Sequence, residues 1–198
     1  MTVPATLGWI DRSMSEPSLL RDLIRKAKGG DLHSFEDLVI LHEALVLRVA
    51  QRLLLNREDA QDAAQEVFLR LQRDLKHFQQ ERDFAPWLYR MTVNICHDVR
   101  RRRKQEIPLE DVMEAPSMSP DAETTILLQQ QQEMVVAALD SLSERERVAI
   151  VLRDLEGLST AEVAAATGVS EGTVRSQISM GRVKIRNYVA ARLRRRSV

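Results

Sequence analysis

The chain has 198 residues, of which 44% are hydrophobic and 4% aromatic, and its formal net charge is zero. This length suits one large domain or two small ones, and scarce glycine and proline without period-two alternation predict an all-α fold. No apolar run approaches the ~18 residues of a membrane span, and the N-terminus lacks a secretory signal. We therefore expect a cytoplasmic protein without membrane insertion.

The sequence offers no support for catalysis or metal binding. Its single cysteine, Cys96, lies within a helical pattern and is expected to be a small buried or half-buried residue. The four histidines are scattered, and no Cys/His cluster has the spacing of metal ligands. Because no nucleophile–base pair or phosphate-cradling glycine loop is present, we do not expect an enzyme.

Charge is segregated along the chain although its total is zero. Residues 84–104 carry a net charge of +5 and residues 171–198 carry +7, whereas residues 105–125 carry −6. A local patch, and not the total charge, sets the attraction of a protein to phosphate. Two cationic segments on either side of an acidic segment are therefore compatible with nucleic-acid binding.

The N-terminal part predicts three helices after a tail at residues 1–17, in which Met14 is an alternative start. An amphipathic helix from about Leu20 ends at Gly29-Gly30, and Asp31 caps a second helix that reaches about Leu55. The third helix runs from Glu58 to about Leu75. Its inner face is apolar, and its outward residues include Asp59, Asp62, Gln65, Glu66 and Arg70.

A polar break at 77–83, with Phe78 as an apolar anchor, precedes a fourth helix that ends in the cationic run 100–104. Asn94, Asp98, Arg101 and Arg102 share one side of this helix because their spacing is i, i+4, i+7 and i+8. Five successive cations exceed what a helix C-terminus requires and would repel one another without an anionic partner. The plainer alternative is a solubilising run.

Residues 105–125 contain three prolines and six acidic residues, and they predict a flexible linker. Fully extended, this segment would reach about 70 Å, whereas as a random coil it would span roughly 25 Å. Nothing in the chain fixes the distance between the two cationic segments. We therefore expect either loose binding to two DNA segments or a larger partner that holds the two modules apart.

The C-terminal part predicts a helix over 126–142 and then a helix-turn-helix. A first capping box, Ser143 with Glu146, opens a helix that is closed by Gly157. A second box, Ser159 with Glu162, starts a short helix, the turn at Gly168 requires positive φ, and Ser170 caps the last helix. Val174, Ile178 and Ile185 are predicted to face inward. The residues left on other faces are Thr173, Arg175, Ser176, Gln177, Ser179, Arg182 and Lys184.

A capped helix with an apolar seam and an exposed row of arginine, serine and glutamine is suited to reading the major groove of DNA. The alternative is a helical hairpin with a solvated polar face. A free-standing helix-turn-helix regulator would also need a dimer seam or an effector pocket. The N-terminal half instead carries the W-L-Y-R…N…D…R-R-R-R-K helix, for which such a regulator has no use.

Three motifs together resemble the extracytoplasmic-function (ECF) sigma factors of the sigma-70 family. DAQDAAQEVFLRL (59–71) resembles the polymerase-binding helix of sigma region 2, and FQQERDFAPWLYRMTVNICHDVRRRRK (78–104) resembles the module that opens and reads the −10 element. The segment 139–178 resembles region 4, whose helix-turn-helix reads the −35 element. Their order around an acidic linker makes the resemblance specific. It implies a tail at 1–17, region 2 at 18–104, a linker at 105–125 and region 4 at 126–198.

The resemblance also implies site residues and partners. Contacts to the −35 element are expected from Thr173, Arg175, Ser176, Gln177, Ser179, Met180 and Arg182. Contacts to the −10 element are expected from Phe78, Gln80, Arg82, Asn94, Asp98, Arg101 and Arg102. Contacts to core RNA polymerase are expected from Asp59, Asp62, Gln65, Glu66, Phe68 and Leu69. The implied partners are the clamp helices and flap of core polymerase, promoter DNA and an anti-sigma factor, with no cofactor and a monomeric free chain.

The sequence departs from the family pattern in two places. Gln177, Met180 and Gly181 replace residues of the common T-V-K/R-S-R-x-x-R-A-R run, so two expected cations are absent, and Gly181 would cost ~1 kcal/mol within a helix. The −10 loop at 79–82 also differs from the common glycine-and-serine type. These departures leave the preferred promoter sequence open.

Overall fold

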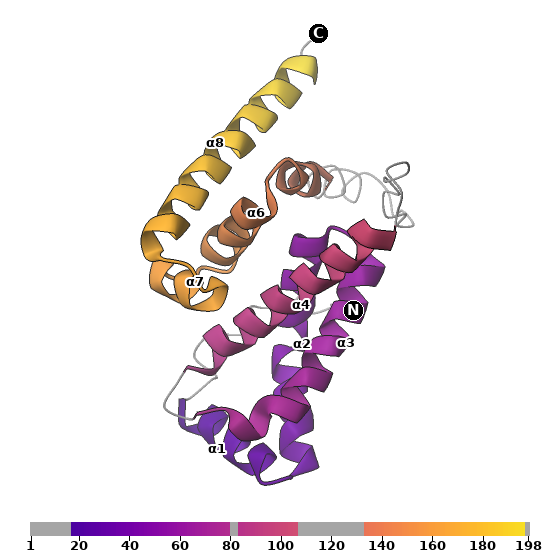
Figure 1. Cartoon of the computed structure of the whole chain (residues 1–198), viewed down its shortest axis with the longest axis vertical. Coiled ribbons are helices and arrows are strands. Elements are labelled where there is room, and N and C mark those ends of the chain that lie inside the picture. Colours follow the sequence, from indigo (N-terminus) through magenta and orange to yellow (C-terminus); the bar gives the residue numbers. More distant parts are fainter. Residues whose placement is uncertain (1–16, 80–82, 107–132, 197–198) are drawn as a thin grey trace, which may run out of the picture.

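The computed structural model describes residues 17–79, 83–106 and 133–196, and the regular elements in those ranges are all helical. The predicted all-α class is confirmed (Figure 1). No helix in the described ranges combines the length and the apolarity that a membrane span requires. The predicted tail up to residue 16, the linker from 107 to 125 and the start of the helix predicted at 126–142 lie outside the described residues.

The first four helices form what we call the N-terminal bundle. Asp31 accepts a hydrogen bond from the His33 amide at 3.2 Å, and Asn56 accepts one from the Asp59 amide at 2.9 Å, so side chains cap the second and third helices. The second helix ends where Leu55 adopts a left-handed conformation. The elements are α1 (Pro17–Lys28), α2 (Leu32–Leu54), α3 (Arg57–Asp74), the 3₁₀ turn η1 (Leu75–His77) and α4 (Phe84–Glu106).

The core of the bundle lies between α2, α3 and α4. Three alanines on the inner face of α3, Ala60, Ala63 and Ala64, are buried and let the neighbouring helices approach closely. The fully buried large side chains around them are Leu38, Val46, Val49, Val67, Leu71, Leu88 and Ile95. Cys96 is also buried, as predicted, and burial raises the pKa of its thiol to about 12.

Residues 133–196 form what we call the C-terminal unit. As predicted, the Glu146 carboxylate accepts a hydrogen bond from the Ser143 amide at 2.9 Å, which completes the capping box. The helix that follows does not stay α-helical to Gly157, because a π-helical turn begins at Val151. The elements after the helical residues 133–140 are α6 (Glu144–Ile150), η2 (Val151–Leu155), α7 (Thr160–Thr167) and α8 (Glu171–Arg196).

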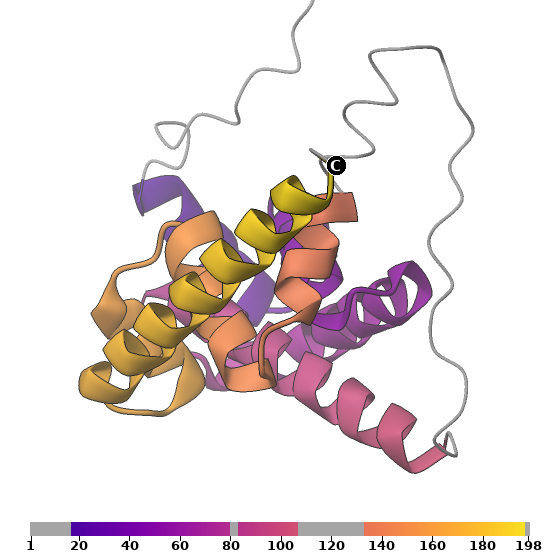
Figure 2. The same cartoon turned by 90° about the horizontal axis from the view of Figure 1, so that it is seen from above.

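The two parts pack directly against each other. Helix α4 contacts α7, α2 contacts α6 and η2, and one continuous apolar core includes residues of both parts. Two views show the C-terminal unit lying along the bundle while the end of α8 projects away from it (Figures 1 and 2). The expectation that nothing in the chain fixes the distance between the cationic segments therefore does not hold for this structure.

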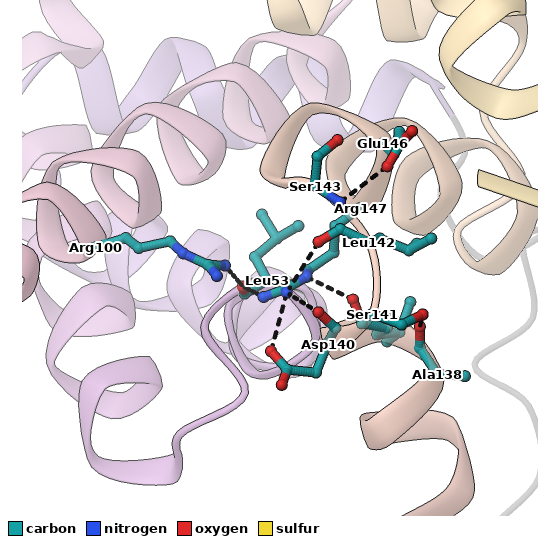
Figure 3. Close-up of polar contacts among 10 residues, drawn as sticks. Leu53, Arg100, Ala138, Asp140, Ser141, Leu142, Ser143, Glu146 and Arg147 are labelled. Carbon is teal, nitrogen blue, oxygen red and sulfur yellow. Dashed lines mark hydrogen bonds and ion pairs between the residues drawn. The ribbon is translucent and has the colours of Figure 1, made fainter. Parts of the chain in front are cut away.

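Arg147 is a charged side chain buried at this contact, with 1% of its surface exposed. Its guanidinium donates to the carbonyls of Leu139 at 2.9 Å and Asp140 at 3.3 Å within the C-terminal unit. It also donates to the carbonyl of Leu53, near the C-terminus of α2, at 3.1 Å (Figure 3). Burial and the neighbouring Arg100 lower its pKa to about 10, so the guanidinium stays charged at neutral pH.

Candidate nucleic-acid interface

The predicted helix-turn-helix is present at α7 and α8. Ser159 Oγ accepts from the Glu162 amide at 3.2 Å, and Glu162 accepts from the Ser159 amide at 2.7 Å, so the capping box is complete. Gly168 ends α7 with φ of +73°, a conformation that side chains with a Cβ rarely adopt. The Thr173 amide donates to Ser170 Oγ at 3.2 Å, which caps α8 as predicted.

Most of the residues predicted to read DNA on α8 lie on its exposed side. Val174 and Ile178 are buried, which turns the opposite side of the helix outward. Arg175 lies 3.6 Å from Glu171, one turn earlier on the same helix. Both side chains of this ion pair are exposed, so Arg175 remains available at the surface. The exposed residues of the predicted set are Thr173, Arg175, Ser176, Ser179, Met180 and Arg182.

Gln177 is an exception, because only 8% of its surface is exposed. The prediction that it lies in the outward row is wrong. Position 177 follows Val174 by three residues and precedes Gly181 by four, so it falls within the buried stripe of the helix. The prediction for Gln177 failed because it relied on the polarity of the side chain and not on its position relative to the buried residues of the helix.

Two ion pairs fix the middle of α8 against the preceding helices. Arg182 donates to both carboxylate oxygens of Asp154, at 2.9 and 2.6 Å, and this interaction raises its pKa. Lys184 donates at 2.7 Å to Glu146, which also completes the capping box of α6. If Arg182 contacts a DNA phosphate, its guanidinium would therefore have to bind that phosphate as well as Asp154.

The start of the predicted −10 loop is held by an aromatic cluster. The Phe78 ring, 5% exposed, packs edge-on against Phe84 at 5.5 Å between ring centroids and lies 4.9 Å from Trp87. Lys28 of α1 donates to the Phe78 carbonyl at 2.6 Å. The predicted anchor role of Phe78 is confirmed, whereas Gln80 and Arg82 lie outside the described residues.

Two shallow cavities adjoin this cluster. One, of about 190 Å³, is lined by His77, Phe78, Gln79 and Trp87. The other, of about 140 Å³, brings the predicted Asn94 together with residues of α3 and α4 that were not among those predicted for the −10 element. Its lining residues are Arg70, Asp74, Trp87, Arg90, Met91 and Asn94. The i, i+4 spacing of Arg90 and Asn94 could have pointed to Arg90, but Arg70 comes from another helix and required the tertiary structure.

Arginines at the cationic end of α4 form ion pairs with acidic residues of the chain itself. Arg102 donates to Glu66 at 3.1 Å, and Arg103 forms an ion pair with Asp59, so α4 is joined to α3 by charge. Arg101 lies 3.5 Å from Asp98 on its own helix. The charge of this run is therefore partly neutralised without DNA. Two of the residues predicted to bind polymerase, Asp59 and Glu66, are the anionic partners in these ion pairs.

The outward face of α3 keeps three of the residues predicted for polymerase contact at the surface. Asp62, Gln65 and Leu69 are exposed and follow one another at i, i+3 and i+7. Leu69 has 68% of its surface exposed, so this face presents an apolar side chain between its polar residues. Phe68 is half-buried against the core, so it supports this face from behind.

Comparisons with known proteins agree with this arrangement. The family model for sigma-70 region 2 matches residues 38–106, and the model for sigma-70 region 4 matches residues 132–185. The chain is 41% identical over 185 residues to the ECF RNA polymerase sigma factor SigE of Mycolicibacterium smegmatis, covering 92% of this chain and 71% of the relative. The chain belongs to the ECF sigma factors of the sigma-70 family.

Further relatives and structures are consistent with that assignment. This sigma factor is 32% identical over 192 residues to the ECF RNA polymerase sigma-E factor of Escherichia coli, covering 92% of this chain and all of the relative. CnrH in complex with the cytosolic domain of CnrY has a similar fold, with a TM-score of 0.67, 25% identity and coverage of 86% and 97% of the two chains. The sigma factor RpoE in complex with the anti-sigma factor NepR, from Bartonella quintana, shares the fold, with a TM-score of 0.65, 22% identity and coverage of 80% and 98%.

Sigma factors are non-catalytic specificity subunits of RNA polymerase that direct transcription initiation. This sigma factor is accordingly not an enzyme but a DNA-binding subunit with regions 2 and 4.

Proposed function

We propose that region 2 of this sigma factor attaches to core RNA polymerase and opens the −10 element, while region 4 reads the −35 element. The observation that carries this proposal is the exposed row on α8, a capped helix whose opposite side is buried. Helices of this kind enter the major groove with their N-terminal residues at the base edges. Arg175, Ser176 and Ser179 are the strongest candidates because they combine exposure with hydrogen-bonding side chains.

The −10 contacts are proposed for the loop after Phe78 and for the side of α4 that carries Asn94. Aromatic anchoring of Phe78, with its carbonyl held by Lys28, fixes the start of that loop. Gln80 and Arg82 would then contact an extruded base. The aromatic cluster around Phe78 would suit single-stranded nucleic acid, because bases stack on aromatic side chains. Asp98, Arg101 and Arg102 would support the melted strand from the same helix.

Polymerase contact is proposed for the outward face of α3. Asp62 and Gln65 would supply polar contacts around the exposed Leu69, which matches the apolar centre and polar rim of typical interfaces. Asp59 and Glu66 would contribute less directly, because their carboxylates are engaged by Arg103 and Arg102. The clamp helices of core polymerase are the partner that family membership suggests, and region 4 would meet the flap.

We further propose that the free chain is a cytoplasmic monomer that an anti-sigma factor can inhibit, and that it joins the nucleoid as part of the holoenzyme. The support is the fold shared with RpoE, which was solved with the anti-sigma factor NepR. Affinity purification from the native host, followed by gel filtration, would test the partner and the oligomeric state.

Run-off transcription with core polymerase on a randomised promoter library tests the whole proposal. We expect selected sequences to share two short motifs separated by a narrow range of spacings. Transcripts without any shared upstream motif would contradict promoter reading by this chain. Tight and selective binding of a defined duplex by the chain alone would instead favour a free-standing regulator.

A further inference from the structure

An uncharged face runs along α8 between Ser176 and Val183. Four exposed residues follow one another there at i, i+3, i+4 and i+7, so they share one side of the helix, opposite its buried stripe. They are Ser176, Ser179, Met180 and Val183. We call this surface the central face of α8, because charged residues lie along its edges.

Two of these four side chains are large and apolar. Met180 is 50% exposed and Val183 is 47% exposed. With a rise of ~1.5 Å per residue they lie about 4.5 Å apart along the helix axis, and the spacing i, i+3 makes them neighbours on the surface. Because so much of each side chain is left in water, a partner that covers the pair would gain hydrophobic stabilisation that the folded chain alone does not provide.

Cations lie along both edges of the central face. Arg175 and Arg182, at i and i+7, are exposed along one edge, and Lys184 is exposed along the other. Ion pairs hold two of these groups, because Arg182 donates to Asp154 of η2 and Lys184 donates to Glu146 of α6. Their charged groups are therefore directed toward the neighbouring helices and leave the apolar pair uncovered. The result is an apolar strip between two cationic edges.

The major groove of B-DNA is complementary to such a surface. Its edges are lined by phosphates, and its floor is formed by the edges of the base pairs. It is about 12 Å wide and admits one α-helix. Thymine presents a methyl group on this floor, whereas the groups presented by the other three bases are hydrogen-bond donors and acceptors. An apolar strip between cationic edges therefore fits a groove whose floor carries thymine methyl groups.

We infer that Met180, together with Val183, recognises thymine methyl groups in the −35 element. The inference rests on the proposed reading of that element by α8, and it names the chemical group that is read. The two side chains lie about 4.5 Å apart along the helix, which is close to the ~3.4 Å step between base pairs. We therefore expect the −35 element to carry thymine, on either strand, at one base pair or at two adjacent base pairs.

The other groups of the surface contribute less to the choice of base. Ser176 and Ser179 are small, so they allow the helix to approach the base edges. A serine hydroxyl both donates and accepts, so it selects weakly among bases. The cations along the two edges are placed to hold phosphates, which position the helix without reading sequence. Selectivity on the central face then comes largely from the methyl contacts.

Replacing thymine by deoxyuridine tests this contact, because it removes the methyl group and leaves the base pairing unchanged. The probe is a promoter that the wild-type holoenzyme has selected from the randomised library, with the thymines of its −35 element replaced one at a time. We expect one replacement, or two at adjacent base pairs, to raise the Kd of the holoenzyme for the promoter about four-fold, the effect of losing one buried methyl group. Replacements elsewhere in the element should leave the Kd unchanged.

Met180→Ala should abolish the dependence on the methyl group at one of these positions. Alanine is the best helix former and position 180 is half exposed, so the fold is retained. Holoenzyme with this variant should bind the thymine and deoxyuridine promoters with equal Kd. Val183→Ala should reduce the preference for the same thymine or for the adjacent one. Val135→Ala is the matched control, because Val135 is 49% exposed in region 4 but lies outside α8, and it should keep the four-fold preference.

Met180→Arg provides a second readout. Arginine donates two hydrogen bonds to guanine O6 and N7, whereas a methyl group offers it no acceptor. Selection from the same library by holoenzyme with this variant should therefore replace the T·A pair by a G·C pair at the position where the wild type depends on the methyl group. Retention of thymine at that position would contradict the contact.

The remaining outcomes separate failure of this inference from failure of the proposed function. If the wild-type holoenzyme distinguishes −35 sequences but binds thymine and deoxyuridine promoters equally at every position, the inference fails and the proposed function stands. If Met180→Ala instead weakens binding to core polymerase in the absence of DNA, the side chain belongs to a polymerase contact, and the inference fails as well. If the wild-type holoenzyme ignores every base change in the −35 element, the proposed function itself fails.

Discussion

Gly181 of α8 lies directly against Ile150 of α6. A Cβ atom at position 181 would meet Ile150 Cγ1 at 2.8 Å and Cδ1 at 3.2 Å, the first of which is closer than real side chains approach. The glycine is buried in the middle of a long helix, where its flexibility would ordinarily be a cost of ~1 kcal/mol. The close packing of α8 on α6, which requires a residue without a side chain at position 181, offsets that cost.

Gly181→Ala should therefore destabilise region 4. Overpacking typically costs about 1–3 kcal/mol, and the better helix propensity of alanine offsets about 1 kcal/mol of this. The free energy of unfolding, from urea denaturation followed by circular dichroism, measures the result. Gly172→Ala is the matched control on the same helix, because its Cβ would meet only Ser170 Oγ at an ordinary 3.8 Å. Equal stabilisation by both substitutions would contradict the close contact.

Leu69→Ser should weaken binding to core polymerase without weakening the fold. The side chain is 68% exposed, so the folded chain alone gains little from it, whereas an apolar anchor at an interface centre often contributes more than 1 kcal/mol. A fluorescence titration with core polymerase would measure the loss as a roughly ten-fold rise in Kd. Leu19→Ser, at a 56% exposed position of α1, is the control. Wild-type affinity in Leu69→Ser would remove α3 from the interface.

Charge reversal on α3 tests the same interface through its polar residues. The double variant Asp62→Lys, Glu66→Lys should abolish transcription while the fold is retained. The exposed Asp62 carries the cleaner signal, because Glu66 also pairs with Arg102. Transcription assays and circular dichroism on both the double variant and Asp62→Lys alone separate these contributions. Normal polymerase binding by the double variant would refute the interface.

Arg175→Ala should weaken promoter binding by about 1–3 kcal/mol, because Arg175 is exposed on the side of α8 that we propose to read DNA. A binding series of the holoenzyme over −35 variants distinguishes two mechanisms. A loss confined to one base pair indicates base recognition, whereas an equal loss on every sequence indicates a phosphate contact. If no promoter variant responds to the substitution, Arg175 does not belong to the site.

Stability should fall at acidic pH through His42. Its Nδ1 atom lies 2.8 Å from the Leu38 carbonyl, its ring packs edge-on against Phe84 at 5.0 Å, and burial lowers its pKa. Between the lowered folded pKa and the unfolded value near 6.5, the unfolded chain binds more protons, so unfolding becomes easier as pH falls.

The expected slope below about pH 6.5 is at most about 1.4 kcal/mol per pH unit for this one group. Urea denaturation at a series of pH values would measure it, and His42→Gln should reduce the slope. His33→Gln, at an exposed position of the same helix, is the control. A slope that is the same in the wild type and in both variants would exclude His42 as its source.

Local signals were sufficient to predict most elements of this sigma factor. The capping boxes at Ser143 and Ser159, the positive φ at Gly168 and the cap at Asp31 depend on residues within about four positions of one another. Their geometry is therefore readable from spacing alone. The motif resemblance to the family worked for the same reason, because each motif is a continuous stretch of one or two helices.

The tertiary structure decided which polar residues face solvent and which partners they have. Gln177 is buried because α8 packs through a wider stripe than its aliphatic residues indicate, and the buried Gly181 belongs to that stripe as well. Arg102 and Arg103 meet Glu66 and Asp59 only because α3 and α4 pack side by side. Helical periodicity orients a residue on its own helix, but it does not determine which neighbouring helix lies opposite.

The sequence by itself determined an all-helical chain, its capped elements and its family, because these follow from residues close together along the chain. Only the tertiary structure revealed that region 4 rests on region 2. Glu156 and Arg147 lie about a hundred residues away from their partners on α2, Arg48 and Leu53, and no local pattern encodes a contact over that separation. Packing in three dimensions brings these groups together, and it therefore sets how far apart the two DNA-reading regions stand in the free protein.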